Sequence, residues 1–265
     1  MKKILSIVSA LAVMLTIASC GSENKNENDK GSDGKVTQVI YGDGTPTEEE
    51  GDTSAEAIEY MKENHPFFYD NFFSKRNHIP LAFISSTKTG EGEAVATEIY
   101  VKDEDTMAIV GNDALGRRTR IIYDKDKAYQ IYDEDKKLYK QDYDEAEIIT
   151  AVENTIMKPK YSIVRDSAFN QKENDYNGVD YNCYIVSYYD VYSKSVVDTE
   201  YYFDKNTNEI RYIMSQGVVS EVKLLSNEIP DESVFDIPSD YEEDTVEKLN
   251  EEIMEELSKA QENAE

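Results

Sequence analysis

Tryptophan is absent from this chain of 265 residues, and cysteine and histidine occur only twice each. Two cysteines are too few for a multi-disulfide scaffold or for the usual Cys/His zinc site. Basic residues are also scarce, at 28 against 55 acidic residues, which gives a formal net charge of −27. Nucleic acids and anionic lipid headgroups both attract clustered Lys and Arg. The composition therefore argues against nucleic acid as a partner and against polybasic docking on a membrane.

Long apolar runs are missing too, with one exception at the N-terminus. A basic start at residues 1–3 precedes 14 largely apolar residues, Ile4–Ile17, and then the small residues Ala18 and Ser19. A transmembrane helix needs ~20 apolar residues, so this run is too short to span a bilayer well. A basic start, a short apolar stretch and a small-residue boundary are typical of an export signal.

The end of this signal resembles a bacterial lipobox. Ile17-Ala18-Ser19-Cys20 matches that pattern, although Leu is more usual where Ile17 stands. The resemblance implies that 1–19 is a lipoprotein signal peptide and that Cys20 carries the lipid. At least two acyl chains give stable anchoring. The expected location is the extracytoplasmic face of the cell membrane, with the membrane as a partner through the N-terminal lipid. The alternative is an ordinary secretory signal followed by a coincidental Cys.

Lipidation of Cys20 would leave Cys183 without a disulfide partner. Cys183 lies in a β-like run, 181–186, with no basic neighbour in sequence to lower its pKa. A buried small hydrophobic residue is therefore a better interpretation than a reactive thiol.

The remaining chain divides by composition into three parts. Residues 20–53 are polar and predict a flexible tether with a reach of ~30 Å. Within it, 36–41 is the one apolar stretch, which suits a short strand or a partner contact. Residues 54–241 contain the aromatic and β-branched residues of a folded domain. Residues 242–265 predict an acidic amphipathic helix and tail.

Alternation of apolar and polar residues with a period of two dominates 79–227. The clearest apolar sets are Val95, Thr97, Ile99 and Val101; Thr119, Ile121 and Tyr123; Val197, Thr199, Tyr201 and Phe203; and Val222 and Leu224. This pattern predicts antiparallel strands with one covered and one solvated face. Helical periodicity appears near 53–65, 144–157 and 245–260. The predicted fold class is α+β: a strongly curved antiparallel sheet, or half-barrel, with helices on its concave face and an added C-terminal amphipathic helix.

Three motifs resemble the LolA/LolB superfamily of lipoprotein carriers, which includes the stress sensor RseB. They are RIIYDKDKAY at 120–129, YYFDKNTNEI at 201–210 and VFDIPSDY at 234–241. The resemblance covers about 54–241 and implies a half-open barrel whose apolar cavity takes acyl chains or a peptide. The C-terminal helix departs from the family pattern. No functional residue of the family transfers to this chain apart from the lipid-bearing Cys20.

Motifs for catalysis or metal binding are weak. His65 and His78 have no metal partner at helical spacing and no nucleophile motif, so loop or core positions are expected. The stretch 204–208 begins like a calcium loop but lacks the Gly and Glu that such a loop requires, which favours a hairpin turn. We therefore predict no catalytic residue, no metal, no cofactor and no enzymatic activity.

Two functions remain open. The first is binding of a lipid or acyl chain in the concavity, with the predicted lining residues Ile99, Val101, Ile121, Tyr123, Tyr201 and Phe203. The second is a non-enzymatic interaction or envelope-stress sensor lipoprotein with a filled core, whose acidic surface would attract a basic protein partner. A cavity above ~300 Å³ would favour the first function, and a packed interior would favour the second.

Overall fold

The computed structural model describes residues 38–39, 47–48, 53–89, 93–155, 162–166, 175–190 and 195–262. The predicted signal peptide, Cys20 and most of the predicted tether lie outside these residues. Within the tether, β1 (Gln38–Val39) pairs with β2 (Thr47–Glu48), so the apolar stretch at 36–41 does contain a short strand. No helix in the described ranges is long and apolar enough to cross a membrane.

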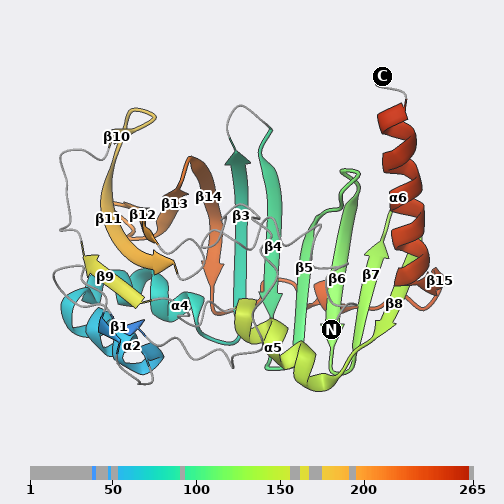
Figure 1. Cartoon of the computed structure of the whole chain (residues 1–265), viewed down its shortest axis with the longest axis horizontal. Coiled ribbons are helices and arrows are strands. Elements are labelled where there is room, and N and C mark those ends of the chain that lie inside the picture. The colour runs from blue at the N-terminus through green and yellow to red at the C-terminus, as the bar shows by residue number, and fades with distance from the viewer. Residues whose placement is uncertain are drawn as a thin grey trace.

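One large open sheet of thirteen strands dominates the molecule (Figure 1). Strand β9 (Ser162–Asp166) pairs with β11, off the main path. The path itself runs through β10 (Asp175–Tyr176), β11 (Val179–Asp190), β12 (Ser195–Asp204), β13 (Ile210–Ser215), β14 (Val218–Ser226), β3 (Leu81–Thr89), β4 (Val95–Val101), β5 (Thr106–Asn112), β6 (Arg118–Asp124), β7 (Lys127–Tyr132), β8 (Lys137–Asp142) and β15 (Glu242–Thr245).

The sheet is mixed, although the sequence predicts only antiparallel strands. Every neighbouring pair on the path is antiparallel except the last, in which β15 runs parallel to β8. Parallel neighbours need a long crossover, and here residues 143–241 separate β8 from β15 in sequence. The acidic C-terminal part that begins at residue 242 therefore starts with an edge strand of the main sheet.

Helical residues share one buried cluster with residues of the sheet. The N-terminal helical segment comprises α2 (Thr53–Asn64), α3 (Pro66–Phe68), the π-helix η1 (Tyr69–Phe73) and α4 (Ser74–Arg76). Helices α5 (Glu145–Thr155) and α6 (Val246–Glu262) come later in the chain. All three groups contribute to one buried cluster with the strands, through residues that include Met61, Phe68, Phe72, Ile148, Val152, Val246 and Leu249.

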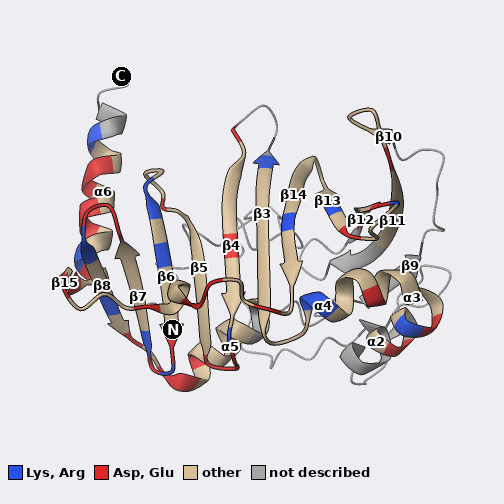
Figure 2. Ribbon diagram, turned by 180° about the vertical axis from the view of Figure 1, so that it is seen from behind, with Lys and Arg blue, Asp and Glu red and all other residues tan. Residues whose placement is uncertain are grey.

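The opposite face is also covered in part, which corrects the prediction of one solvated face. A second buried cluster contains Ala82, Tyr100, Ala108, Val110, Ile122, Ile131 and Leu138. Residues 229–241, here called the back segment, pack against it through Ile229, Val234, Phe235 and Tyr241. Figure 2 shows this connection crossing the strands from β14 to β15. The back segment has no regular alternation of apolar and polar residues, so the sequence pattern did not predict that it packs on the sheet.

Arg120 holds the back segment to the sheet. Its Nη1 donates to the carbonyl oxygens of Ser233, Val234 and Asp236 at 3.3, 2.9 and 2.8 Å. Its Nη2 donates to Asp133 Oδ1 at 3.2 Å. Only 12% of the Arg120 side chain is exposed, although its partner Asp133 is 54% exposed. Each of these bonds is charge-assisted, because the guanidinium is ionised.

We expect Arg120→Ala to lower the free energy of unfolding by ~2 kcal/mol, because it leaves backbone acceptors of the back segment without a donor. Arg118→Ala is the matched control on the same strand. Arg118 is 48% exposed and pairs only with Glu98, so its loss should cost under ~1 kcal/mol. Urea unfolding of both variants measures the difference, and equal losses would contradict the role of Arg120.

Candidate functional site

The six residues predicted to line a ligand site share one face of the sheet. Ile99 and Val101 lie on β4, Ile121 and Tyr123 on β6, and Tyr201 and Phe203 on β12. All six are 0–6% exposed and belong to the same buried cluster. The structure therefore places them together, as core residues that are covered by other side chains.

Strand β5 links the first four of these residues. Ile109 lies opposite both Ile99 and Ile121, and Met107 lies opposite both Val101 and Tyr123. The prediction omitted both β5 residues, although they are 4% and 2% exposed. Their strand is apolar on both faces from Met107 to Val110, so alternation did not reveal which side chains point inward.

Aromatic residues of the N-terminal helical segment cover the β12 pair. Ring centroids of Phe68 and Phe72 lie 4.7 and 5.0 Å from that of Tyr201. Phe67 meets Phe203 edge to face at 5.2 Å. Aromatic pairs at these separations stabilise a packed arrangement beyond their buried area. Phe68 and Phe72 are therefore core residues, 0% and 1% exposed.

Two side chains with polar groups in this core are His65 and Tyr123. His65 is 4% exposed, and its Nδ1 lies 2.9 Å from the hydroxyl of Tyr184. Burial raises the pKa of Tyr123 above its ordinary value, with a smaller contribution from nearby Tyr143. The Tyr123 hydroxyl therefore stays protonated and uncharged at physiological pH, so it offers no charge to a ligand.

The turn after β12 has the hairpin geometry that the sequence favours. Asp204 Oδ1 accepts from the backbone N–H groups of Asn206 and Thr207 at 2.8 and 3.0 Å. These bonds lower the pKa of Asp204. Across the described ranges, no group of three or more His, Cys, Asp or Glu side chains is arranged to hold a metal ion.

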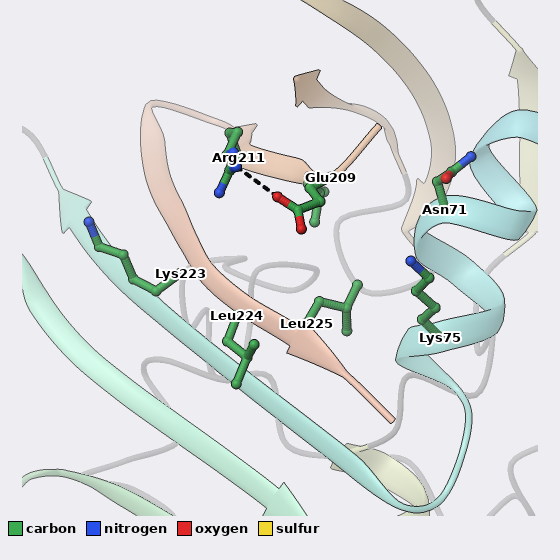
Figure 3. Close-up of a pocket in the computed structure, with 8 residues that line it drawn as sticks. Asn71, Lys75, Glu209, Arg211, Lys223, Leu224 and Leu225 are labelled. Atoms are coloured by element: carbon green, nitrogen blue, oxygen red, sulfur yellow. Dashed lines mark hydrogen bonds and ion pairs between the residues drawn. The ribbon is translucent and has the colours of Figure 1, made fainter. Parts of the chain in front are cut away.

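A pocket that the sequence did not predict lies beside the helical segment. It has a volume of about 70 Å³ and is lined by Asn71, Lys75, Glu209, Ile210, Arg211, Lys223, Leu224 and Leu225. Figure 3 shows Lys75 on the helical side and Leu225 on the strand side of this space, with Glu209 joined to Arg211 and the Lys223 side chain directed away from Lys75. It is separate from the six predicted residues, none of which lines it.

Comparisons with known proteins identify no family. No protein-family model and no curated protein matches the chain. An uncharacterized conserved protein from Thermus thermophilus aligns with a TM-score of 0.37 and 8% identity, over 72% of this chain and 98% of that one. The LolA superfamily protein NE2245 from Nitrosomonas europaea aligns with a TM-score of 0.32 and 10% identity, over 63% and 96%. Neither similarity places the chain in a family.

Truncation of the shared apolar face should destabilise the protein strongly. We expect Ile121→Ala and Tyr201→Ala each to cost ~2–5 kcal/mol, because buried contacts are lost and a cavity remains. Ile237→Ala is the matched control, since Ile237 is 37% exposed and should cost about 0.5 kcal/mol or less. Urea unfolding measures all three. Small losses at Ile121 and Tyr201 would indicate an open rather than a filled interior.

Cys183 should be an unreactive thiol in the folded protein. Burial, aided by the charge of Glu200, raises its pKa from 9.0 to about 12. In a Cys20→Ala variant at pH 8, we expect a thiol reagent to modify the native protein at least about a hundredfold more slowly than the urea-unfolded chain. Comparable rates would contradict this assignment.

The same shift has a consequence for stability against pH. Because the unfolded chain ionises Cys183 first, its contribution to stability is complete below pH 9.0 and is lost as the pH rises toward about 12.

Proposed function

We propose that this protein is a lipid-anchored, extracytoplasmic and non-enzymatic interaction protein whose curved sheet is filled by its own helices. The observation that carries the proposal is the burial of all six predicted lining residues under side chains of the same chain. A site that awaits a ligand would leave part of this face uncovered.

The burial of the aromatic cover supports a filled interior. An acyl chain could reach the inner face only if Phe68 and Phe72 moved away, and both are 0–1% exposed. Exposing each side chain would cost ~1.5–3 kcal/mol before any ligand contact formed.

The acidic surface supports a basic protein partner. Exposed carboxylates gather on β15 and α6, at one end of the sheet (Figure 2). They include Glu242, Glu243, Glu247, Glu251, Glu255 and Glu256. Some of these acids pair with lysines, such as Glu243 with Lys140 and Glu255 with Lys259, but acids remain in excess. An excess of one sign accelerates association with a partner of opposite charge, and the effect weakens with salt.

The membrane location rests on the sequence. The lipobox-like Ile17-Ala18-Ser19-Cys20 and the polar stretch after it would tether the domain at the membrane surface. Three motifs resemble the LolA/LolB superfamily, and that superfamily includes the stress sensor RseB. A sensor role agrees with the proposed interaction function.

Binding of a lipid or acyl chain is the second candidate. One observation favours it: the six predicted residues belong to one apolar cluster, in which Ile109 and Met107 join the four on β4 and β6. Residues of the N-terminal helical segment belong to the same cluster. In that function the N-terminal helical segment would have to leave the sheet when the ligand enters.

Native mass spectrometry of the protein extracted from its own membrane in mild detergent tests both candidates. We expect the mass of the acylated chain, a protein partner that is retained at low salt and lost at high salt, and no free lipid. A stoichiometric lipid released on denaturation would favour the second candidate. A protein that carries neither would contradict both.

Cys20→Ala is the control for the anchor in the same measurement. We expect this variant to lose the mass of the acyl chains and to leave the membrane fraction, or to retain its signal peptide. An unchanged mass and unchanged fractionation would refute lipidation.

A further inference from the structure

Helix α6 is held to the fold through one side of its first half. Val246 and Leu249 are each 1% exposed and belong to the buried cluster, and Ile253 packs against that cluster. The Tyr139 hydroxyl donates to Glu252 Oε2 at 3.2 Å. Figures 1 and 2 show the C-terminal part of α6 extending past the ends of β7 and β8. The described chain therefore covers the second half of this helix only in part.

Met254, on this second half, is the most exposed large apolar side chain in the described part of the chain, at 63%. It follows Ile253 directly, which turns it ~100° away from the buried side of the helix. Leu257 lies three residues further and is half-buried, so the two side chains are neighbours on the helix surface. Single exposed apolar residues are common, so this apolar strip is informative only through the charges next to it.

A column of carboxylates runs beside the apolar strip. Glu247, Glu251 and Glu255 recur every four residues of α6, and all three are exposed. Like charges at this spacing destabilise a helix. The helix dipole favours Glu247 in the first turn, but its effect does not reach Glu251 or Glu255. The acidic column therefore lowers the stability of a helix whose second half has little support from packing.

The lysines of α6 neutralise little of the acidic column. Lys248 pairs with Asp244, which precedes the helix. Lys259 pairs with Glu255 at 2.6 Å, and both of these side chains are largely exposed, so the pair contributes little. Glu247 and Glu251 form no ion pair with another described residue. Their charges are thus available to cations from outside the chain.

The chemistry of the apolar strip and the acidic column disfavours two occupants and selects a third. A second copy of this chain would bring carboxylates against carboxylates, and an anionic membrane surface would be repelled in the same way. A partner with apolar side chains flanked by Lys or Arg would bury Met254 and neutralise Glu251. A helix meets both needs, because packed helices lie ~8–10 Å apart and present neighbouring residues at the same four-residue spacing.

We propose that the C-terminal half of α6 docks a basic amphipathic helix of a partner protein. Met254 and Leu257 pack among apolar side chains of the partner, while its Lys or Arg residues pair with the acidic column. Methionine suits such a contact, because its flexible and polarisable side chain adapts to its neighbours. This inference rests on the proposed interaction function, since it names the surface that the basic partner contacts and the form of that partner.

Fluorescence anisotropy with a synthetic peptide tests the proposal. The probe is a labelled amphipathic helix of about 17 residues, with Leu along one side and Lys along the other. The protein is the full chain with Cys20→Ala in detergent-free buffer, because the probe would also bind micelles. We expect saturable binding that weakens with salt. Hydrogen exchange in the complex should slow in α6 and stay unchanged in β11.

Met254→Gln should weaken peptide binding roughly tenfold, which corresponds to ~1.4 kcal/mol, because the apolar contact is lost. Its matched control is Val179→Thr, since Val179 is 49% exposed at the start of β11. Glu251→Gln should weaken binding about threefold and leave the melting temperature unchanged or higher, because a like-charge contact is removed. Its matched control is Glu228→Gln, since Glu228 is exposed just before the back segment. Neither control should change the affinity.

Two kinds of failure are distinguishable. Absence of saturable peptide binding, equal losses in the controls, or full affinity in Met254→Gln and Glu251→Gln would overturn the inference about α6. So would a protein partner that the native membrane extract retains equally well with Met254→Gln, although the interaction function would then stand. An extract of the wild type that retains no protein partner would instead overturn the interaction function itself.

Discussion

The contact between the N-terminal helical aromatics and strand β12 is the interaction on which the rest of the structure depends. A sheet face is stable only when another layer covers it, and this sheet has thirteen strands to cover. Helices of three or five residues, such as α3 and η1, are not stable alone. Phe68 and Phe72 therefore stabilise the sheet and gain their helical conformation from it.

The buried cluster is assembled from distant parts of the chain. The N-terminal helical segment, α5 and α6 all contribute residues to it, from the start, the middle and the end of the described chain. On the opposite face, Arg120 contacts a segment more than 100 residues away in sequence. Contacts between residues so far apart in sequence raise the contact order, which slows folding.

Local patterns in the sequence predicted much of the sheet. Alternation in 95–101 and 119–123 identified strands, and it placed Ile99, Ile121 and Tyr201 correctly on one face. The pattern failed at Ile122, which is buried on the opposite face because the irregular back segment lies over it. It also failed at β15, whose sequence Glu-Glu-Asp-Thr has low strand propensity and pairs only because the back segment delivers it beside β8.

The inner face and the pocket differ in how much the sequence could reveal. The alternation of side chains along each strand predicted which residues share the inner face. It could not predict whether helices fill that face, because this depends on packing between segments far apart in sequence. The pocket gave no signal at all. Arg211 and Lys223, which line it, lie at single-residue shifts in strand register, and such shifts interrupt the alternation from which strand faces are predicted.

The parallel edge strand has a consequence for self-association. An open sheet ends in unpaired backbone groups, and these groups can template the addition of another copy. Here the edge beside β8 is a strand of four residues, three of them acidic. A second copy that paired at this edge would bring carboxylates against carboxylates, which disfavours the contact. The strand that completes the sheet therefore also disfavours pairing of two copies at this edge.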